Sequence, residues 1–308
     1  ATKQSWIGMA GPAMIEGGGL GKFDPKEIGP TDVQKNNGVI DYVAENEKDA
    51  TNIAKKILSY FQGEIKNWKA DDQKKLSNIM PKDRRWSYPV RDIIKIISDI
   101  EQFTEIRPEY GKGIVSCFIR IEGKPFGLLA NDSQHLGGAI DSEGADKASS
   151  FIEMCSEYGL PLISLVDTPG FMVGPDSEKE GAVRRMSNLF KIGSKVKVPL
   201  TAIFLRKGYG LGAQAMVGGS LHEPVYTAAW PTGEFGAMGL EGAVKLGFKK
   251  ELEKIEDNSK REELFNSLVE KLYDKGKAIE AAAHLEIDAV INPSETRSVI
   301  LKSQKAFV

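Results

Sequence analysis

A glycine-rich turn in the second half of the chain carries the residues best suited to chemistry. Residues 200–205 (LTAIFL) are typical of a buried strand, and residues 206–216 (RKGYGLGAQAM) place glycines before the helix that residues 213–217 indicate. Glycines let a ligand approach the backbone, and the first amides of a helix have no partner within it. Such N–H groups can stabilise an oxyanion. The pattern predicts main-chain catalysis of a reaction that passes through an enolate or a tetrahedral oxyanion.

Two other interpretations compete for the same turn. Residues 210–215 (GLGAQA) fit the dinucleotide pattern G-x-G-x-x-A, which should be followed about 20 residues later by a strand that ends in an acid. The next predicted strand, 225–230, ends in Trp230 and Pro231, which disfavours a nicotinamide or flavin site. The other alternative is a glycine-rich connection that only packs tightly. The pattern alone is weak.

The composition is that of an ordinary globular protein. The 308 residues are 41% hydrophobic and 27% charged, with a formal net charge of -2. This balance gives no electrostatic case for nucleic acid or an anionic membrane. Cys117 and Cys155 lie among apolar neighbours, so we expect buried, reduced thiols. No apolar run approaches the roughly 20 residues that span a bilayer, and we expect a cytoplasmic protein, or a matrix protein without its transit peptide.

Alternating apolar segments predict an α/β fold around the turn. Residues 114–121 and 125–130 indicate a buried hairpin, and a later strand at 160–167 precedes the one that leads into the turn. Helices between these strands predict parallel pairing through helical crossovers. Because ligands of α/β folds gather at strand carboxyl ends, the turn at 167–171 (DTPGF) is a second candidate. Helices are predicted at 46–61, 92–100, 144–154, 179–194, 241–246, 260–273, 277–284 and 293–305, and short strands at 38–43 and 287–291.

The chain is predicted to have three parts. Residues 1–62 are rich in loops and glycine and hold too little apolar sequence for a core of their own. Residues 63–86 are polar and charged without sustained periodicity, which is typical of a linker. The second folded unit is expected to span residues 87–308.

Several stretches of the second unit together resemble the carboxyltransferase subunit or domain of biotin-dependent acyl-CoA carboxylases, of the propionyl-CoA and acetyl-CoA carboxylase type. Each is weak alone, but they follow the family's order and cover about residues 85 to 308. They are 88–91 (YPVR), 127–131 (GLLAN), 166–171 (VDTPGF), 206–210 (RKGYG), 229–234 (AWPTGE), 238–244 (MGLEGAV) and 292–297 (NPSETR).

The resemblance implies a pair of crotonase-like (ClpP-like) domains, each a spiral of ββα units. It also implies a homo-oligomer whose active site lies between the amino-terminal domain of one subunit and the carboxy-terminal domain of another. Residues 1–62 resemble only the end of the amino-terminal domain. The family's first oxyanion hole is therefore expected on a preceding segment.

The chemistry implied by the resemblance moves a carboxylate from carboxybiotin to the α-carbon of an acyl-CoA. Carboxybiotin releases CO2, the ureido anion removes an α-proton, and the thioester enolate attacks CO2, so two oxyanion holes suffice without a side-chain base. The resemblance places the second hole on Gly210, Leu211, Gly212 and Ala213. Leu211 and Gly212 stand where the family usually has a Gly-Ala pair, which leaves open which two amides point inward.

The resemblance also suggests substrate-binding residues. The loop at 131–141 borders the pocket in this superfamily, and the segment at 169–174 resembles the one on the biotin side. A plain turn is the alternative for the loop, and simple core packing is the alternative for Phe171. Gln214 is a specificity candidate, with a solvated helix residue as the alternative. The candidates are Gly137, Gly138, Ala139, Pro169, Gly170, Phe171, Gly174 and Gln214.

Several charged residues near these motifs leave alternatives open. Arg206 and Lys207 suit pairing with a CoA phosphate or with a neighbouring acid, and a solvated or ion-paired turn is an equal alternative. Glutamates act as acid and base in crotonase-type hydratases, but the Trp-Pro context of Glu234 favours a structural role. The three histidines share no ligand spacing, so no metal site is predicted.

The absence of a biotinyl-lysine signature and of an ATP-binding loop implies partner domains. Acyl-CoA is then the substrate, a biotin carboxyl carrier brings carboxybiotin, and a biotin carboxylase consumes ATP. A biotin-dependent acyl-CoA decarboxylase uses the same site in reverse, so it is a second hypothesis. A non-catalytic scaffold fragment of a carboxylase is a third, against which the intact glycine turn argues.

Overall fold

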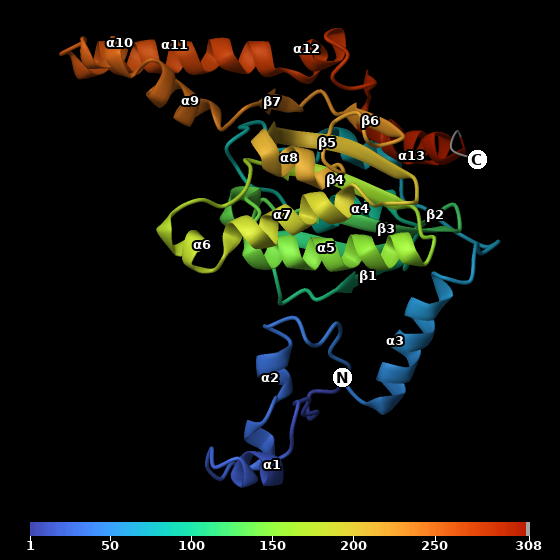
Figure 1. Ribbon diagram of the computed structural model, residues 1–308. Coiled ribbons are helices and arrows are strands. Elements are labelled where there is room, and N and C mark those ends of the chain that lie inside the picture. Colours follow the sequence, from blue (N-terminus) through green and yellow to red (C-terminus); the bar gives the residue numbers. More distant parts are fainter. Residues whose placement is uncertain (306–308) are drawn as a thin grey trace.

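A mixed β-sheet forms the centre of the computed structural model, which describes residues 1–305 (Figure 1). Its strands lie in the order β1-β2-β3-β4-β5-β6-β8, and β7 pairs with the end of β5. The first three are antiparallel, and every pairing from β3 onward is parallel, which confirms the predicted α/β fold with helical crossovers. The strands are β1 (Phe103–Ile106), β2 (Ile114–Ile121), β3 (Lys124–Asn131), β4 (Leu162–Thr168), β5 (Leu200–Tyr209), β6 (Tyr226–Ala229), β7 (Glu234–Gly236) and β8 (Ala289–Val290).

Helices cover both faces of the sheet. Side chains along each strand alternate between two cores, as Leu162 and Ile163 of β4 do. Because both faces are buried, the strands have nearly continuous apolar sequences, and this explains why they were predictable. One face is covered by α5 (Ser142–Glu157), α7 (Ala182–Gly193) and α8 (Gly210–Met216), and the other by α4 (Val90–Ile97) and α13 (Thr296–Lys305).

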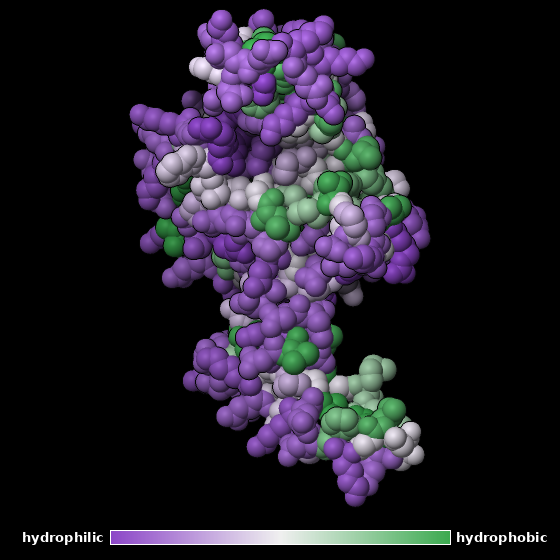
Figure 2. Space-filling model, turned by 90° about the vertical axis from the view of Figure 1, so that its left-hand side faces the viewer, coloured by the Kyte–Doolittle hydropathy of each residue, from purple (hydrophilic) through white to green (hydrophobic). Residues whose placement is uncertain are grey.

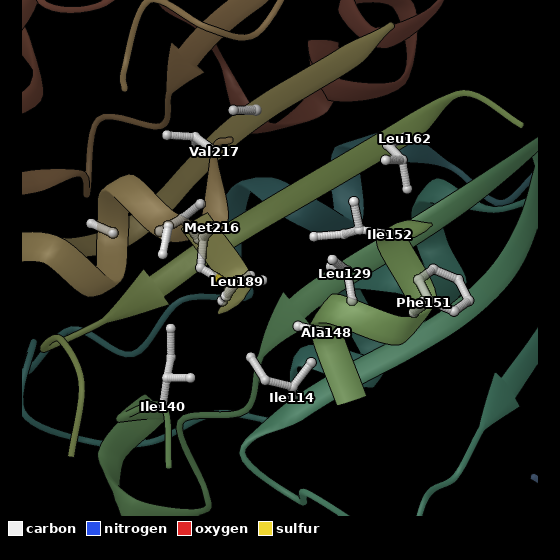
Figure 3. Packing of buried hydrophobic residues seen from close by; sticks show 14 of the residues in the cluster. Ile114, Leu129, Ile140, Ala148, Phe151, Ile152, Leu162, Leu189, Met216 and Val217 are labelled. Atoms are coloured by element: carbon white, nitrogen blue, oxygen red, sulfur yellow. The ribbon is translucent and has the colours of Figure 1, made fainter. Parts of the chain in front are cut away.

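The first of these cores holds α8 against the sheet (Figure 3). Met216 of α8 and Leu189 of α7 belong to the same buried cluster as Ile152 of α5, and the sheet contributes Leu129 and Leu162. Burying one such side chain stabilises the fold by about 1.5–3 kcal/mol. The helix that carries the glycine turn is therefore anchored firmly at its carboxyl half. Both cysteines are buried and free, as predicted.

The beginning of the chain forms a smaller lobe beside the body, and the molecule narrows between the two (Figure 2). Large apolar side chains of the lobe, such as Met9, Met14 and Leu20, are exposed. The strand predicted at 38–43 is absent, because the amides of Val39 and Ile40 both donate to the carbonyl oxygen of Gln34, which ends a short helix. The lobe contains α1 (Pro12–Gly17), η1 (Pro25–Glu27), α2 (Thr31–Gln34) and α3 (Glu47–Ser59).

The segment predicted as a linker is packed against the body. Its 3₁₀-helix η2 (Gln73–Asn78) buries Leu76 completely, and the amide of Ile65 donates to the Gly123 carbonyl oxygen at 3.1 Å. Arg120 of β2 donates to the carbonyl oxygen of Gly63 at 2.8 Å. Backbone hydrogen bonds therefore hold the segment against the body, and the polar composition of its sequence does not reveal them. The boundaries 1–62, 63–86 and 87–308 stay a prediction.

The remaining helices follow the prediction with local differences. The helix predicted at 179–194 corresponds to α7 but starts later, because Gly181 before α7 has a φ of +74°. The short helix α6 (Pro175–Lys179) precedes it and was not predicted. The short strands β1 and β7 were not predicted. Within residues 1–305, none of the helices combines the length and apolar character that a bilayer crossing needs. The others are η3 (Leu136–Gly138), α9 (Leu240–Gly247), α10 (Lys249–Glu253), α11 (Asn258–Gly276), α12 (Ala278–Ala283) and η4 (Pro293–Glu295).

Candidate active site

The glycine-rich turn joins β5 directly to α8. β5 runs to Tyr209 and α8 begins at Gly210, earlier than the sequence indicated. Gly210 has a φ of +58°, and a Cβ atom on it would lie 2.8 Å from the Ala237 carbonyl oxygen, so glycine is required. Leu211 and Gly212 follow in the first helical turn, where N–H groups have no partner inside the helix. The predicted oxyanion donors thus lie at the carboxyl end of β5.

Two other candidate segments meet at this turn. A Cβ atom on Gly212 would lie 2.6 Å from the carbonyl carbon of Gly170, so the start of α8 packs directly on that backbone. The amide of Ile140 donates to the Gly170 carbonyl oxygen at 3.0 Å, which joins the same segment to the loop at 136–140. The start of α8, the segment at Gly170 and the loop at 136–140 therefore contact one another through their backbones, although they are far apart in the sequence.

Gly138 of the 136–140 loop fits closely against β4, whereas a Cβ atom on Gly137 would have no atom within 4 Å. Gly137 and Gly138 both have left-handed backbones, with φ of +63° and +90°. A Cβ atom on Gly138 would lie 2.3 Å from the Asp167 carbonyl oxygen, so no larger residue fits there. Ala139 is buried. The structure places these residues near the turn, and their part in substrate binding stays a prediction.

A cleft of about 560 Å³ opens beside the turn. Gly210, Ala213 and Gln214 line it, together with Phe235 of β7 and His284 after α12. Gln214 is exposed, so its amide is available to a ligand in the cleft. The cleft offers a neutral side-chain amide and an aromatic wall, whereas Leu211 and Gly212, the predicted oxyanion donors, are not among the residues that line it.

The remaining candidates do not line this cleft. Phe171 is half-buried, and its ring centroid lies 6.1 Å from that of Phe190, so it packs on the core as the simpler interpretation expects. Pro169 is also half-buried. Gly174 caps α6 with a φ of +121°. Their contact with a substrate stays a prediction.

A buried ion pair lies directly beneath the turn. Nη2 of Arg206 donates to Asp167 Oδ2 at 2.9 Å, and the amide of Lys207 donates to Asp167 Oδ1 at 3.0 Å. Arg206 also donates to the carbonyl oxygens of Arg84 and Trp86. Of the two alternatives for Arg206, the structure therefore shows pairing with a neighbouring acid.

Lys207 connects this ion pair to the second loop. Its ammonium donates to the carbonyl oxygen of Gly137 and lies 3.7 Å from Asp167 Oδ1. Burial lowers the pKa of Lys207, while the charge of Asp167 raises it in part. Asp167 thus holds β5 and, through Lys207, the loop at 136–140.

Comparison with known proteins identifies the family. The model of the carboxyl transferase domain matches residues 1–308, the whole chain. The chain belongs to the carboxyl transferase domain family. This confirms the resemblance found in the sequence.

Solved structures of carboxyltransferases share the fold. A single-chain, multi-domain long-chain acyl-CoA carboxylase is 51% identical, with a TM-score of 0.91, over 98% of this chain and 30% of the longer one. The transcarboxylase 12S structure, described as a hexamer, is 29% identical with a TM-score of 0.86 over 99% of this chain and 60% of its own. These likenesses confirm the predicted crotonase-like fold class.

Curated relatives include enzymes that act in different directions. The methylmalonyl-CoA decarboxylase subunit alpha of Veillonella parvula is 28% identical over 98% of this chain and 59% of its own length. The chain spans between about half and three fifths of the length of several curated relatives that it matches.

Three further residues lie near this turn, of which the sequence did not indicate two and favoured a structural role for Glu234. They are Arg84, Tyr209 and Glu234, which meet behind β5 and are described below. No sequence signal joins them, because each comes from a different segment. Within residues 1–305, no group of three or more His, Cys, Asp or Glu side chains is arranged to hold a metal ion.

Proposed function

We propose that this chain is part of the carboxyltransferase component of a biotin-dependent acyl-CoA carboxylase. It would move a carboxylate from carboxybiotin to the α-carbon of an acyl-CoA through an enolate held by backbone amides. The observation that carries this proposal is the family match over residues 1–308, within which the glycine turn is intact at Gly210 and Gly212.

The geometry of the turn suits this chemistry. The amides of Leu211 and Gly212 are free of helical partners, and the rigid contact between Gly212 and Gly170 fixes the start of α8. Preorganised donors of this kind stabilise developing negative charge, and losing one typically costs about 3 kcal/mol in the barrier. Carboxybiotin, when bound, supplies the carboxyl group and the ureido anion that takes the α-proton. Gln214, at the cleft, is positioned to contact a bound substrate.

The partners of this component follow from the same proposal. A biotin carboxyl carrier would deliver carboxybiotin, a biotin carboxylase would charge it, and a second subunit would complete the active site in a homo-oligomer. The hexamer named for transcarboxylase 12S supports an oligomer. A cytoplasmic location stays a prediction from the sequence.

The decarboxylase direction is the second candidate, and the relative from Veillonella parvula favours it. Both directions use one site, so the partners distinguish them. Association with an ATP-dependent biotin carboxylase would support the carboxylase, and association with a membrane subunit would support the decarboxylase. The scaffold hypothesis predicts no transfer in either direction.

We predict that the full-length protein containing this chain transfers carboxylate from carboxybiotin to an acyl-CoA. The assay follows loss of carboxybiotin with acetyl-, propionyl- and long-chain acyl-CoAs. Long-chain acyl-CoAs are included because the long-chain carboxylase is 51% identical to this chain over 30% of its own length. The acyl-CoA with the highest kcat/KM names the substrate. Absence of transfer to every acyl-CoA by the folded, full-length protein would contradict the proposed function and favour a scaffold.

A further inference from the structure

A second group of polar side chains is buried behind the glycine turn. Glu234 of β7 is 1% exposed and Tyr209 of β5 is 2% exposed. Among residues 1–305, neither oxygen of Glu234 nor the hydroxyl of Tyr209 has a hydrogen-bond partner at the observed distances. The guanidinium of Arg84 lies nearby, with Nη1 3.6 Å from Glu234 Oε2.

This group is connected to the turn through the backbone. β7 pairs in parallel with the end of β5, with Glu234 opposite Lys207 and Gly236 opposite Tyr209. Tyr209 is the N-cap of α8 and immediately precedes Gly210. The position of the Tyr209 side chain therefore bears directly on the direction of the next peptide groups.

A buried carboxylate without hydrogen bonds is costly, so the environment of Glu234 must compensate for it. Burial raises the pKa of Glu234, and Arg84 opposes this shift. Burial likewise raises the pKa of Tyr209, and the nearby Glu234 raises it further, so the phenol keeps its proton. Glu234 pairs with Lys207, two residues before Tyr209, so the side chains of Glu234 and Tyr209 leave the sheet on the same face. A protonated hydroxyl near a carboxylate that lacks donors makes a natural donor and acceptor pair.

Neither Glu234 nor Tyr209 lines the cleft, so these side chains do not reach a substrate there. Arg84 also contacts a second carboxylate, because its Nη2 donates to Glu241 at 2.6 Å. We therefore infer that Glu234 acts on the reaction through Tyr209 and the turn. The buried position of Glu234 favours the structural role over the acid and base role that glutamates have in crotonase-type hydratases.

We propose that Glu234, Tyr209 and Arg84 form a positioning unit for the oxyanion turn. In this unit the Tyr209 hydroxyl moves closer than the observed distance to donate to the Glu234 carboxylate, Arg84 balances the charge, and together they hold the start of α8 in the direction that the reaction needs. The catalytic part of this inference rests on the proposed function.

Tyr209→Phe tests the unit with the loss of one oxygen atom. We expect kcat to fall about 10- to 100-fold with KM for acyl-CoA within about twofold, because a small misplacement of the amides weakens transition-state binding alone. Amide hydrogen exchange within residues 210–216 should become faster. Glu234→Gln keeps an acceptor and should cost less, and the double variant should be no worse than Tyr209→Phe. Glu241→Gln removes the charge of the other Arg84 partner but keeps an acceptor, and it should change neither quantity.

Amide hydrogen exchange and kcat together distinguish a failure of the positioning unit from a failure of the proposed function. Unchanged exchange within residues 210–216 in Tyr209→Phe would overturn the positioning unit. Faster exchange with kcat within about twofold would show a purely structural contact and would also overturn it. Faster exchange in a protein whose unmodified form transfers no carboxylate would support the unit and contradict the function.

Discussion

Replacing Gly212 by alanine should abolish most of the carboxyl transfer while the body of the protein stays folded. Alanine is the better helix former by about 1 kcal/mol, so helix propensity alone predicts a gain. The new Cβ atom, however, would lie 2.6 and 2.7 Å from the carbonyl carbon and Cα of Gly170, and 2.9 Å from the Phe171 nitrogen. These are backbone atoms that cannot rotate away, so α8 and its amides must shift.

We expect Gly212→Ala to lower kcat about 100-fold or more and to destabilise the fold by about 1–3 kcal/mol. Gly247→Ala is the matched control, because this glycine ends α9, is exposed and has no atom within 4 Å of a new Cβ. Activity of the control should be unchanged. Steady-state kinetics and urea unfolding measure both effects. Full activity in Gly212→Ala would show that the contact with Gly170 does not position the donors.

Replacing Asp167 by alanine is expected to cause the largest loss of stability. Asp167 is fully buried and pairs with Arg206, whose side chain is also almost fully buried. Removing one partner of a buried pair leaves an uncompensated charge and typically costs about 3–5 kcal/mol. The same change releases Lys207 and, through it, the Gly137 carbonyl oxygen. Activity should therefore fall together with stability.

The control for Asp167→Ala is a surface ion pair whose N–O distance matches that of the buried pair. Asp176 and Lys179 of α6 lie 2.9 Å apart, with side chains that are largely exposed. Asp176→Ala should cost no more than about 1 kcal/mol, because water screens such pairs. Urea unfolding of both variants gives the comparison. A loss below about 1 kcal/mol for Asp167→Ala would contradict the role of this ion pair in the fold.

The secondary structure of the body could be predicted because local and tertiary signals agree there. Both faces of the sheet are buried, so β2, β3, β4 and β5 are continuous apolar segments that sequence alone reveals. Glycine at 210 also has a local signal, since it stands at a junction between strand and helix. The prediction of a strand at 38–43 was wrong, because the amides of Val39 and Ile40 donate to a carbonyl oxygen at the end of a helix instead of to a neighbouring strand.

The sequence by itself determined the family, the α/β class and the glycine turn, because residue types at fixed spacing specify these features. Only the tertiary structure decided which groups surround that turn. The contact of Gly212 with Gly170 and the pairing of Arg206 with Asp167 join segments about 40 residues apart, and Arg84 reaches Glu234 over a longer span. Charged residues such as these look like surface residues in the sequence, since burial depends on neighbours that only folding brings together.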